Sequence, residues 1–202
     1  VQDVRKSSLT FAPEAGSQRM RNVINKGLTK DDILNGAGLA FEGGWNKVKL
    51  YFMLGLPQEN EEDITEIAAL CNEIAAVYYE RVPKEERKGR VQITASTSFF
   101  IPKPFTAFQW ARMNRMEEFI EKAMLTKKSM QSQLNKKSLS YHWHEAGTTI
   151  MEGVFARGDR KISDAILYAY KHGCLFDAWT EQYHHEIWME AMETTGLSLD
   201  FY

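Results

Sequence analysis

Three segments in the first half of the chain alternate apolar and polar residues, and helical patterns lie between them. The three segments are 8–14, 48–54 and 91–101. A period of two predicts β-strands, whereas the apolar positions between 64 and 78 recur with the spacing of an amphipathic helix. Further helices are predicted after Ser17 and from Thr29 to the Gly43-Gly44 pair. Strands separated by helices pair in parallel, because a helical crossover returns the chain to the same end of the sheet.

Residues that favour helix ends support these boundaries. The pairs with capping-box spacing are Thr29 with Asp32 and Asn60 with Asp63. Gly36 and Gly38 are costly inside a helix. They therefore predict either close packing against a neighbouring element or a short break in the second helix.

The second half of the chain, 111–202, shows helical patterns only. The expected helices are 116–136, 150–157, 162–172 and 180–194. Thr149 and Glu152 predict the beginning of the second of these. We therefore expect an α/β fold. Residues 1–110 would form about three parallel strands with crossover helices, as half of a barrel or of a doubly wound sheet, and residues 111–202 a helical extension packed on it.

Each predicted strand has one apolar and one polar face. The polar faces carry Thr10, Ala12 and Glu14, then Lys49, Tyr51 and Met53, then Thr94, Ser96 and Ser98. Parallel strands that are buried on both faces are usually almost entirely hydrophobic. The polar faces therefore predict a barrel interior that holds water or a polar ligand. The alternative is a sheet with one face open to solvent, and the alternation alone is compatible with both.

Composition narrows the class of protein. Hydrophobic residues make up 44% of the chain and charged residues 26%, which is typical of globular proteins. The 25 basic and 27 acidic residues leave a net charge of −2, so charge alone indicates no nucleic-acid partner. No apolar run is long enough for a membrane span, and residues 1–6 lack a signal-peptide core. The two cysteines are too few for a disulfide framework. These three observations predict a cytoplasmic protein. Because the sequence starts at Val1, we expect a piece of a longer chain or a processed one.

Three motifs lie at the ends of the predicted strands. They are FAPEAGS at 11–17, KLYFMLGLPQE at 49–59 and FIPKPFTAFQW at 100–110. In this order and spacing they resemble the fourth, fifth and sixth strands of the radical S-adenosylmethionine (SAM) barrel. The helical part, with EGVFARGDR at 152–160, is similar to the same bacterial branch of that superfamily, which has no assigned reaction and often carries a cobalamin-binding-like domain upstream. The resemblance covers nearly all of the chain and implies the C-terminal half of a TIM-type barrel followed by a helical extension.

The resemblance implies that nine residues line the pocket for SAM and substrate. They are Glu14, Gly16, Ser17, Lys49, Tyr51, Gly55, Pro57, Ser98 and Phe100. By this resemblance Glu14 pairs with the amino group of SAM, since an ammonium group in a partly desolvated pocket favours a carboxylate acceptor. Gly55 and Pro57 match the stretch beside the adenosine. Gly16 and Ser17 match a turn in which backbone N–H groups can approach the SAM carboxylate.

Lys49 and Tyr51 face the expected interior and match positions that meet the substrate or the SAM carboxylate. Phe100 begins the segment expected to contact adenine or substrate. Three of the residues have plainer alternatives: Glu14 as a cap of the helix that follows it, Lys49 as a solvated strand charge, and Gly55 as part of a common strand-ending turn. The sequence assigns no catalytic residue.

The superfamily binds its 4Fe–4S cluster through a Cys-x3-Cys-x2-Cys motif. Here Cys71 and Cys174 are more than a hundred residues apart, and three cysteine ligands cannot come from two cysteines. The resemblance therefore assigns the cluster to a missing N-terminal half and allows cobalamin as a cofactor of the complete enzyme, although this chain has no Asp-x-His-x-x-Gly motif. The complete enzyme is expected to cleave SAM reductively to a 5′-deoxyadenosyl radical that attacks an unknown substrate. This chain alone is expected to be inactive.

Other chemistry is less well supported. The five histidines, all within 142–185, lack the spacing of a metal site. Two alternatives to the radical SAM enzyme remain open: a non-catalytic binding or scaffold module, which the missing cysteines favour, and a methylthiotransferase-like enzyme that modifies RNA or protein. The second class usually adds a basic β domain that is absent from this pattern. As partners we expect neither nucleic acid nor membrane, but self-association through the open edge of an incomplete barrel.

Overall fold

The computed structural model of the chain describes residues 7–202. Residues 1–6, which belong to the expected first domain and to the segment without a signal-peptide core, lie outside the described residues. The chain divides into two compact units. The first comprises the chain up to Ser98 together with Ile120–Trp143, and the second comprises Phe99–Phe119 together with His144–Tyr202. The expected boundary near residue 110 does not coincide with this division, because the chain returns to the first unit after residue 119.

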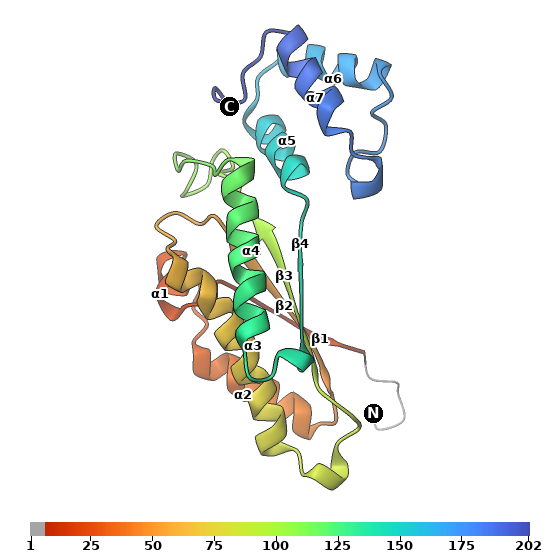
Figure 1. Cartoon of the computed structure of the whole chain (residues 1–202). Coiled ribbons are helices and arrows are strands. Elements are labelled where there is room, and N and C mark those ends of the chain that lie inside the picture. Colours follow the sequence, from red (N-terminus) through yellow and green to blue (C-terminus); the bar gives the residue numbers. More distant parts are fainter. Residues whose placement is uncertain (1–6) are drawn as a thin grey trace. The chain divides into compact units, whose positions relative to one another are not determined.

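The first unit is built on a sheet of four strands, which neighbour each other in chain order (Figure 1). The strands are β1 (Leu9–Glu14), β2 (Lys47–Leu54), β3 (Gln92–Phe99) and β4 (Leu139–Trp143). β1 pairs in parallel with β2, with Thr10 opposite Lys49, and β3 pairs in parallel with β4, with Ser96 opposite His142. The predicted α/β class and the first three strands are confirmed.

Helices connect these strands. They are α1 (Gln18–Val23), α2 (Lys30–Glu42), α3 (Glu61–Arg81) and α4 (Met116–Ser132), with short 3₁₀ turns at Lys84–Glu86 and Lys136–Ser138. Both predicted capping boxes are present, at Thr29 before α2 and at Asn60 before α3. α2 is unbroken, and a Cβ atom at Gly38 would lie 2.6 Å from the guanidinium of Arg81 on α3. α2 therefore packs closely on α3 at this glycine, where the approaching atoms belong to the flexible Arg81 side chain, and the two helices lie side by side in Figure 1.

The two faces of the sheet differ as the alternation predicted. On β2, Val48, Leu50, Phe52 and Leu54 are buried, whereas Lys49 and Tyr51 are exposed. On β3, the buried residues are Ile93, Ala95, Thr97 and Phe99, and the residues between them are only partly buried. We call the face that carries Lys49 and Tyr51 the open face. The buried face contributes its side chains to the core that it forms with the helices.

Residues 111–202 were expected to contain helices only, and the sheet to have about three strands. Both expectations are wrong, because β4 adds a fourth strand from this part of the chain. Its pattern, Leu139-Ser140-Tyr141-His142-Trp143, alternates over five residues, which is too short to distinguish a strand from a loop. Pairing with β3 defines it, together with a hydrogen bond of 2.8 Å between the hydroxyls of Tyr141 and Thr97. Tyr141 thus joins the buried side of the sheet, and its neighbours Ser140 and His142 join the open face.

The second unit contains α5 (Ala146–Arg157), α6 (Ile162–Lys171) and α7 (His185–Thr194). Its core consists of Met151, Val154, Ile162, Ala165, Ala169, Cys174, Trp188, Ala191 and Met192. α5 begins earlier than predicted, because Glu145 and not Thr149 is its N-cap, with the Glu145 carboxylate accepting from the Thr148 N–H at 2.5 Å. α7 begins later than predicted, because Thr180–Gln182 form a separate 3₁₀ turn. Among residues 7–202, no helix combines the length and apolar character that crossing a membrane requires.

Candidate functional site

Three of the predicted site residues lie at the carboxyl-terminal edge of the sheet. Glu14 is the last residue of β1, Gly55 follows β2 directly, and Ser98 is the penultimate residue of β3. Glu14 lies opposite Phe52 in the β1–β2 pairing, and the Ser98 hydroxyl donates to the Phe52 carbonyl oxygen at 3.5 Å. Residues from three neighbouring strands therefore meet at this edge, which is where open parallel sheets usually bind ligands.

Glu14 departs from regular strand geometry. The register shifts between Phe11 and Glu14, and Glu14 has a φ of 67°, which is uncommon for a residue other than glycine. Its carboxylate lies 3.5 Å from the ammonium of Lys26, and 29% of its side chain is exposed. Ser17 is the N-cap of α1, since its hydroxyl accepts from the Met20 N–H at 3.0 Å. The helix-cap alternative for Glu14 is therefore wrong, and its carboxylate is accessible to solvent.

Packing accounts for Gly16 and Ser17 without a ligand. A Cβ atom at the buried Gly16 would overlap the backbone nitrogen of Ile67 on α3 and lie 2.7 Å from the carbonyl carbon of Glu66. The Ser17 hydroxyl also turns to α3 and donates to Oδ1 of Asp63 at 2.5 Å. The turn between β1 and α1 therefore contacts the backbone of α3, and the small size of Gly16 is needed there.

Ser17→Ala should lower the free energy of unfolding of the first unit by about 1–2 kcal/mol. The substitution removes the N-cap of α1 and one donor to the buried Asp63. Urea unfolding followed by far-UV circular dichroism measures the change. The exposed Ser7 provides a matched control, because Ser7→Ala should stay within about 0.5 kcal/mol of the wild type. An unchanged unfolding midpoint for Ser17→Ala would contradict the structural role and favour a role in ligand binding.

Asp63 is the centre of a polar network that joins α1 to the beginning of α3. The Arg19 guanidinium donates to both carboxylate oxygens and, at 2.8 Å, to the Gln58 carbonyl oxygen. The Asn60 N–H donates to the same carboxylate at 2.9 Å. Burial alone would raise the pKa of Asp63, but the hydrogen bonds from Arg19 and Ser17 outweigh it and lower the pKa. Asp63 is therefore held in its charged form.

Arg21 fixes the turn that follows Glu14. Its side chain is fully buried, and it donates to the carbonyl oxygens of Ala15 at 2.9 Å, Gly16 at 2.8 Å and Leu28 at 3.1 Å. Burial lowers the pKa of Arg21. Nothing in the sequence pattern distinguishes this arginine from the exposed arginines that most helices carry, so sequence reasoning missed it.

Gly55 is tied to a buried ion pair. Its N–H donates to Oε2 of Glu59 at 2.8 Å, and the ammonium of Lys122 on α4 donates to the same oxygen at 2.7 Å. Only 3% of the Glu59 side chain is exposed. Burial raises the pKa of Glu59, and the hydrogen bonds from Lys122 and Gly55 oppose the rise in part. Pro57, between the two, is half-buried in the same turn.

The remaining predicted residues lie apart from this edge. Lys49 and Tyr51 lie on the open face, and 45% of Tyr51 is exposed. Phe100 belongs to the second unit, where it is buried and packs edge to face against Phe108 with a centroid distance of 6.1 Å. Phe100 is therefore a core residue of its unit, and the first unit alone brings together the other candidate residues.

The two cysteines do not fit the ligand set of an iron–sulfur cluster. Cys71 and Cys174 are buried in different units. Burial raises the pKa of both thiols, that of Cys174 to about 11, so both are neutral thiols in the metal-free chain. Within residues 7–202, no group of three or more His, Cys, Asp and Glu side chains could hold a metal ion.

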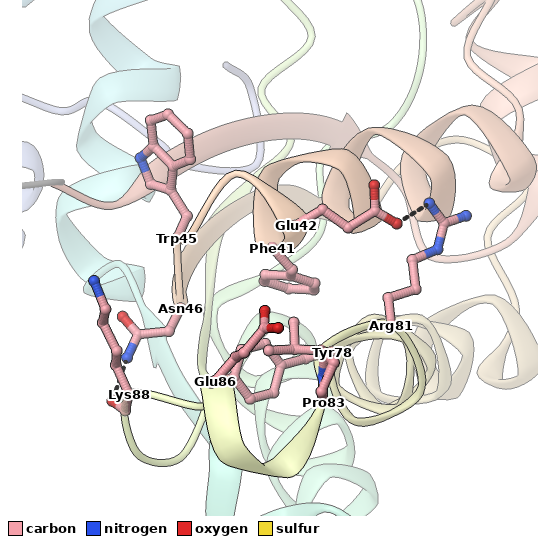
Figure 2. Close-up of a pocket in the computed structure, with 11 residues that line it drawn as sticks. Phe41, Glu42, Trp45, Asn46, Tyr78, Arg81, Pro83, Glu86 and Lys88 are labelled. Atoms are coloured by element: carbon pink, nitrogen blue, oxygen red, sulfur yellow. Dashed lines mark hydrogen bonds and ion pairs between the residues drawn. The ribbon is translucent and has the colours of Figure 1, made fainter. Parts of the chain in front are cut away.

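A cavity of about 150 Å³ lies among the loops that precede β2 and β3 (Figure 2). The rings of Phe41 and Tyr78, with centroids 5.3 Å apart, lie beside it, and the Glu42–Arg81 ion pair at 3.3 Å borders it. None of the predicted site residues lines this cavity. It lies near the amino-terminal ends of the strands and is separate from the edge that carries Glu14.

Comparison with known proteins gives a single informative result. The chain is 34% identical over 175 residues to an uncharacterized protein of Methanocaldococcus jannaschii. The match covers 87% of this chain and 35% of the archaeal protein, so the chain spans about a third of the length of the curated relative that it matches. No family model matches the chain, and no solved structure matches it. The two proteins are therefore related over most of this chain, and the name of the relative describes no activity.

Proposed function

We propose that the first unit of this chain forms the C-terminal half of the barrel of a radical SAM enzyme, and that the second unit is its helical extension. The supporting observation is the open polar face of a parallel sheet whose carboxyl-terminal edge carries Glu14, Gly55 and Ser98. A polar sheet face needs water or a polar ligand as its partner. In the proposed enzyme, further strands from outside these 202 residues would close this face into a barrel interior.

The residues at the edge fit the amino acid part of SAM. The Glu14 carboxylate is partly exposed, and its ion pair with Lys26 is long at 3.5 Å, so an ammonium group of SAM can replace Lys26 as its partner. Lys49 and Tyr51 present a cation and a hydroxyl on the same sheet for the SAM carboxylate or the substrate. Gly55 and Pro57 would border the adenosine. Because the Gly55 N–H already donates to Glu59, this stretch would offer shape and not a free donor.

The iron–sulfur cluster would be bound outside these 202 residues, since Cys71 and Cys174 do not fit it. A cluster held there would supply the reducing electron for SAM cleavage in the complete enzyme. The chain described here would hold SAM and exclude water on one side of the barrel. Cobalamin as a further cofactor of the complete enzyme, and self-association of the incomplete barrel through a sheet edge, both stay predictions.

In the full-length protein, Glu14→Gln should weaken SAM binding by one to two orders of magnitude, because it removes a charge-assisted hydrogen bond worth about 1.5–3 kcal/mol. The amide preserves the shape of the side chain, so the melting temperature should change little. The measurements are calorimetric SAM affinity and 5′-deoxyadenosine production after anaerobic reconstitution of the cluster.

Lys26→Gln is the matched control, since it removes the other half of the same ion pair. SAM binding should be unchanged or tighter in this variant, because Lys26 would compete with the SAM ammonium. Unchanged SAM affinity and 5′-deoxyadenosine production in Glu14→Gln would sink the assignment of Glu14. A wild-type full-length protein that binds a cluster but forms no 5′-deoxyadenosine would sink the proposed function.

A non-catalytic scaffold module is the second candidate. The observation that favours it is that three of the predicted SAM-binding residues already have partners within the chain. Glu14 pairs with Lys26, Ser17 with Asp63, and the Gly55 N–H with Glu59. In a scaffold these pairs would be permanent. The absence of SAM binding by a cluster-loaded full-length protein would support this candidate.

A further inference from the structure

The open face of the sheet arranges its side chains in rows that cross the strands. The pairs that face each other are Thr10 with Lys49, Thr94 with Ser140, and Ser96 with His142. Between β2 and β3, the Gln92 N–H donates to the Asn46 carbonyl oxygen at 2.8 Å, which sets the register of a regular parallel ladder. In that register the neighbours are Lys49 with Thr94, and Tyr51 with Ser96. One row therefore runs from Tyr51 through Ser96 to His142.

The side chains in these rows differ in length. β3 contributes the small hydroxyl residues Thr94 and Ser96, whereas β2 contributes Lys49 and Tyr51, and β4 contributes His142. The backbones of Tyr51 and His142 are two strands apart, which is about 10 Å. A ligand of a few atoms over Ser96 can therefore contact long side chains on both sides and hydroxyl groups beneath it.

The polar groups of the long side chains are free to bind. Within residues 7–202, the ammonium of Lys49, the hydroxyl of Tyr51 and the ring of His142 make no hydrogen bond or ion pair. All three residues are exposed. Their donors therefore need no rearrangement to meet a ligand.

The open face carries more basic than acidic groups. The strands contribute the ammonium groups of Lys47 and Lys49 and the imidazole of His142, and the one carboxylate within these four strands is that of Glu14, which pairs with Lys26. The whole chain has a net charge of −2, so this excess of basic groups is local. A face with donors and cations but no free carboxylate in its strands complements an anion.

We propose that the substrate is a small organic anion whose anionic group binds over Ser96, between Lys49 and Tyr51 on one side and His142 on the other. The inference rests on the proposed function, because it takes the open face as the substrate face. His142 is the new member of the site. The ammonium of Lys49 provides the charge, the Tyr51 hydroxyl and the His142 ring donate hydrogen bonds, and Ser96 provides a hydroxyl from below.

Inorganic phosphate serves as the probe for this site in the 202-residue chain. With isotope-labelled histidines, a phosphate titration at constant ionic strength should shift the His142 ring resonances in a saturable way, with a dissociation constant in the millimolar range. The rings of His172, His184 and His185 in the second unit should not follow the same curve. Lys49→Gln should weaken phosphate binding about three- to tenfold, as expected for the loss of one charged contact in an exposed site.

Lys84→Gln is the control, since Lys84 is an exposed lysine in the 3₁₀ turn before β3 and away from the open face. It removes the same charge and should leave phosphate binding unchanged. An unresponsive His142, or equal effects of Lys49→Gln and Lys84→Gln, would overturn the inference. The proposed function fails separately, through the absence of 5′-deoxyadenosine from the full-length protein, so the two failures can be distinguished.

Discussion

Gly16→Ala should destabilise the first unit by about 3 kcal/mol or more, because overpacking against a rigid backbone is among the costliest small substitutions. The added methyl group would overlap the backbone nitrogen of Ile67 in the second turn of α3, where the neighbouring atoms are backbone and no flexible side chain can move aside. α3 would have to separate from the β1–α1 turn. Chemical unfolding followed by tryptophan fluorescence and circular dichroism measures the loss.

Gly36→Ala is the matched control. Gly36 lies inside α2, and its new Cβ atom would make an ordinary contact of 3.5 Å with the Phe11 ring. Alanine is the better helix former by about 1 kcal/mol, so this variant should be as stable as the wild type or more stable. A Gly16→Ala protein with wild-type stability would contradict the close approach of the turn to α3.

Lys122→Met should destabilise the protein by about 3–5 kcal/mol at neutral pH, the usual cost of removing one partner of a buried ion pair. Methionine preserves most of the volume, but the Glu59 carboxylate, 3% exposed, loses its countercharge and keeps only the Gly55 N–H as a donor. Lys128→Met on the same helix is the control. Lys128 is exposed, and its replacement should change the stability by no more than about 0.5 kcal/mol.

The effect of Lys122→Met should depend on pH in a defined direction. The pKa of Glu59 is raised in the folded protein, chiefly by burial, and the loss of Lys122 should raise it further. A carboxyl group with a raised folded-state pKa contributes its full stability below its unfolded pKa of about 4.3, and this contribution is lost as the pH rises through the folded pKa. The deficit of Lys122→Met should therefore be small near pH 4 and grow toward pH 7. A deficit that is constant with pH would contradict a charged Glu59.

Local patterns were sufficient for much of the fold. The alternation in β2 predicted its end at Leu54, its beginning to within one residue, and its buried residues, because each side chain on one face meets the same environment. Thr29 and Asn60 predicted the beginnings of α2 and α3, since a capping box is complete within four residues. β4 was missed because its five residues become a strand only through pairing with β3, more than forty positions away.

Local patterns also located part of the candidate site, and the residues that were missed are those whose roles depend on distant partners. Sequence reasoning found Glu14, Gly55 and Ser98 at the ends of strands, and parallel topology brings such ends together. It missed Arg21 and Lys122, because their roles depend on buried partners in other segments, and a single helical lysine or arginine carries no trace of its burial. A close approach of another group to the backbone was expected at Gly16, and the structure has one, but the group that approaches is helix α3 of the same chain.

The order of the four strands in the sheet is the same as their order in the chain, and this has a consequence for how the protein acquires its structure. Each strand pairs with the strand synthesised just before it, so β2 can add to β1, and β3 to β2, as soon as the new strand has left the ribosome. No strand must be inserted between two that already pair. Each connection to be closed contains one or two helices and is of similar length, which keeps its entropic cost nearly constant as the sheet grows. Once residue 99 has emerged from the ribosomal exit tunnel, the nascent chain should therefore already carry a three-stranded sheet with its open face accessible.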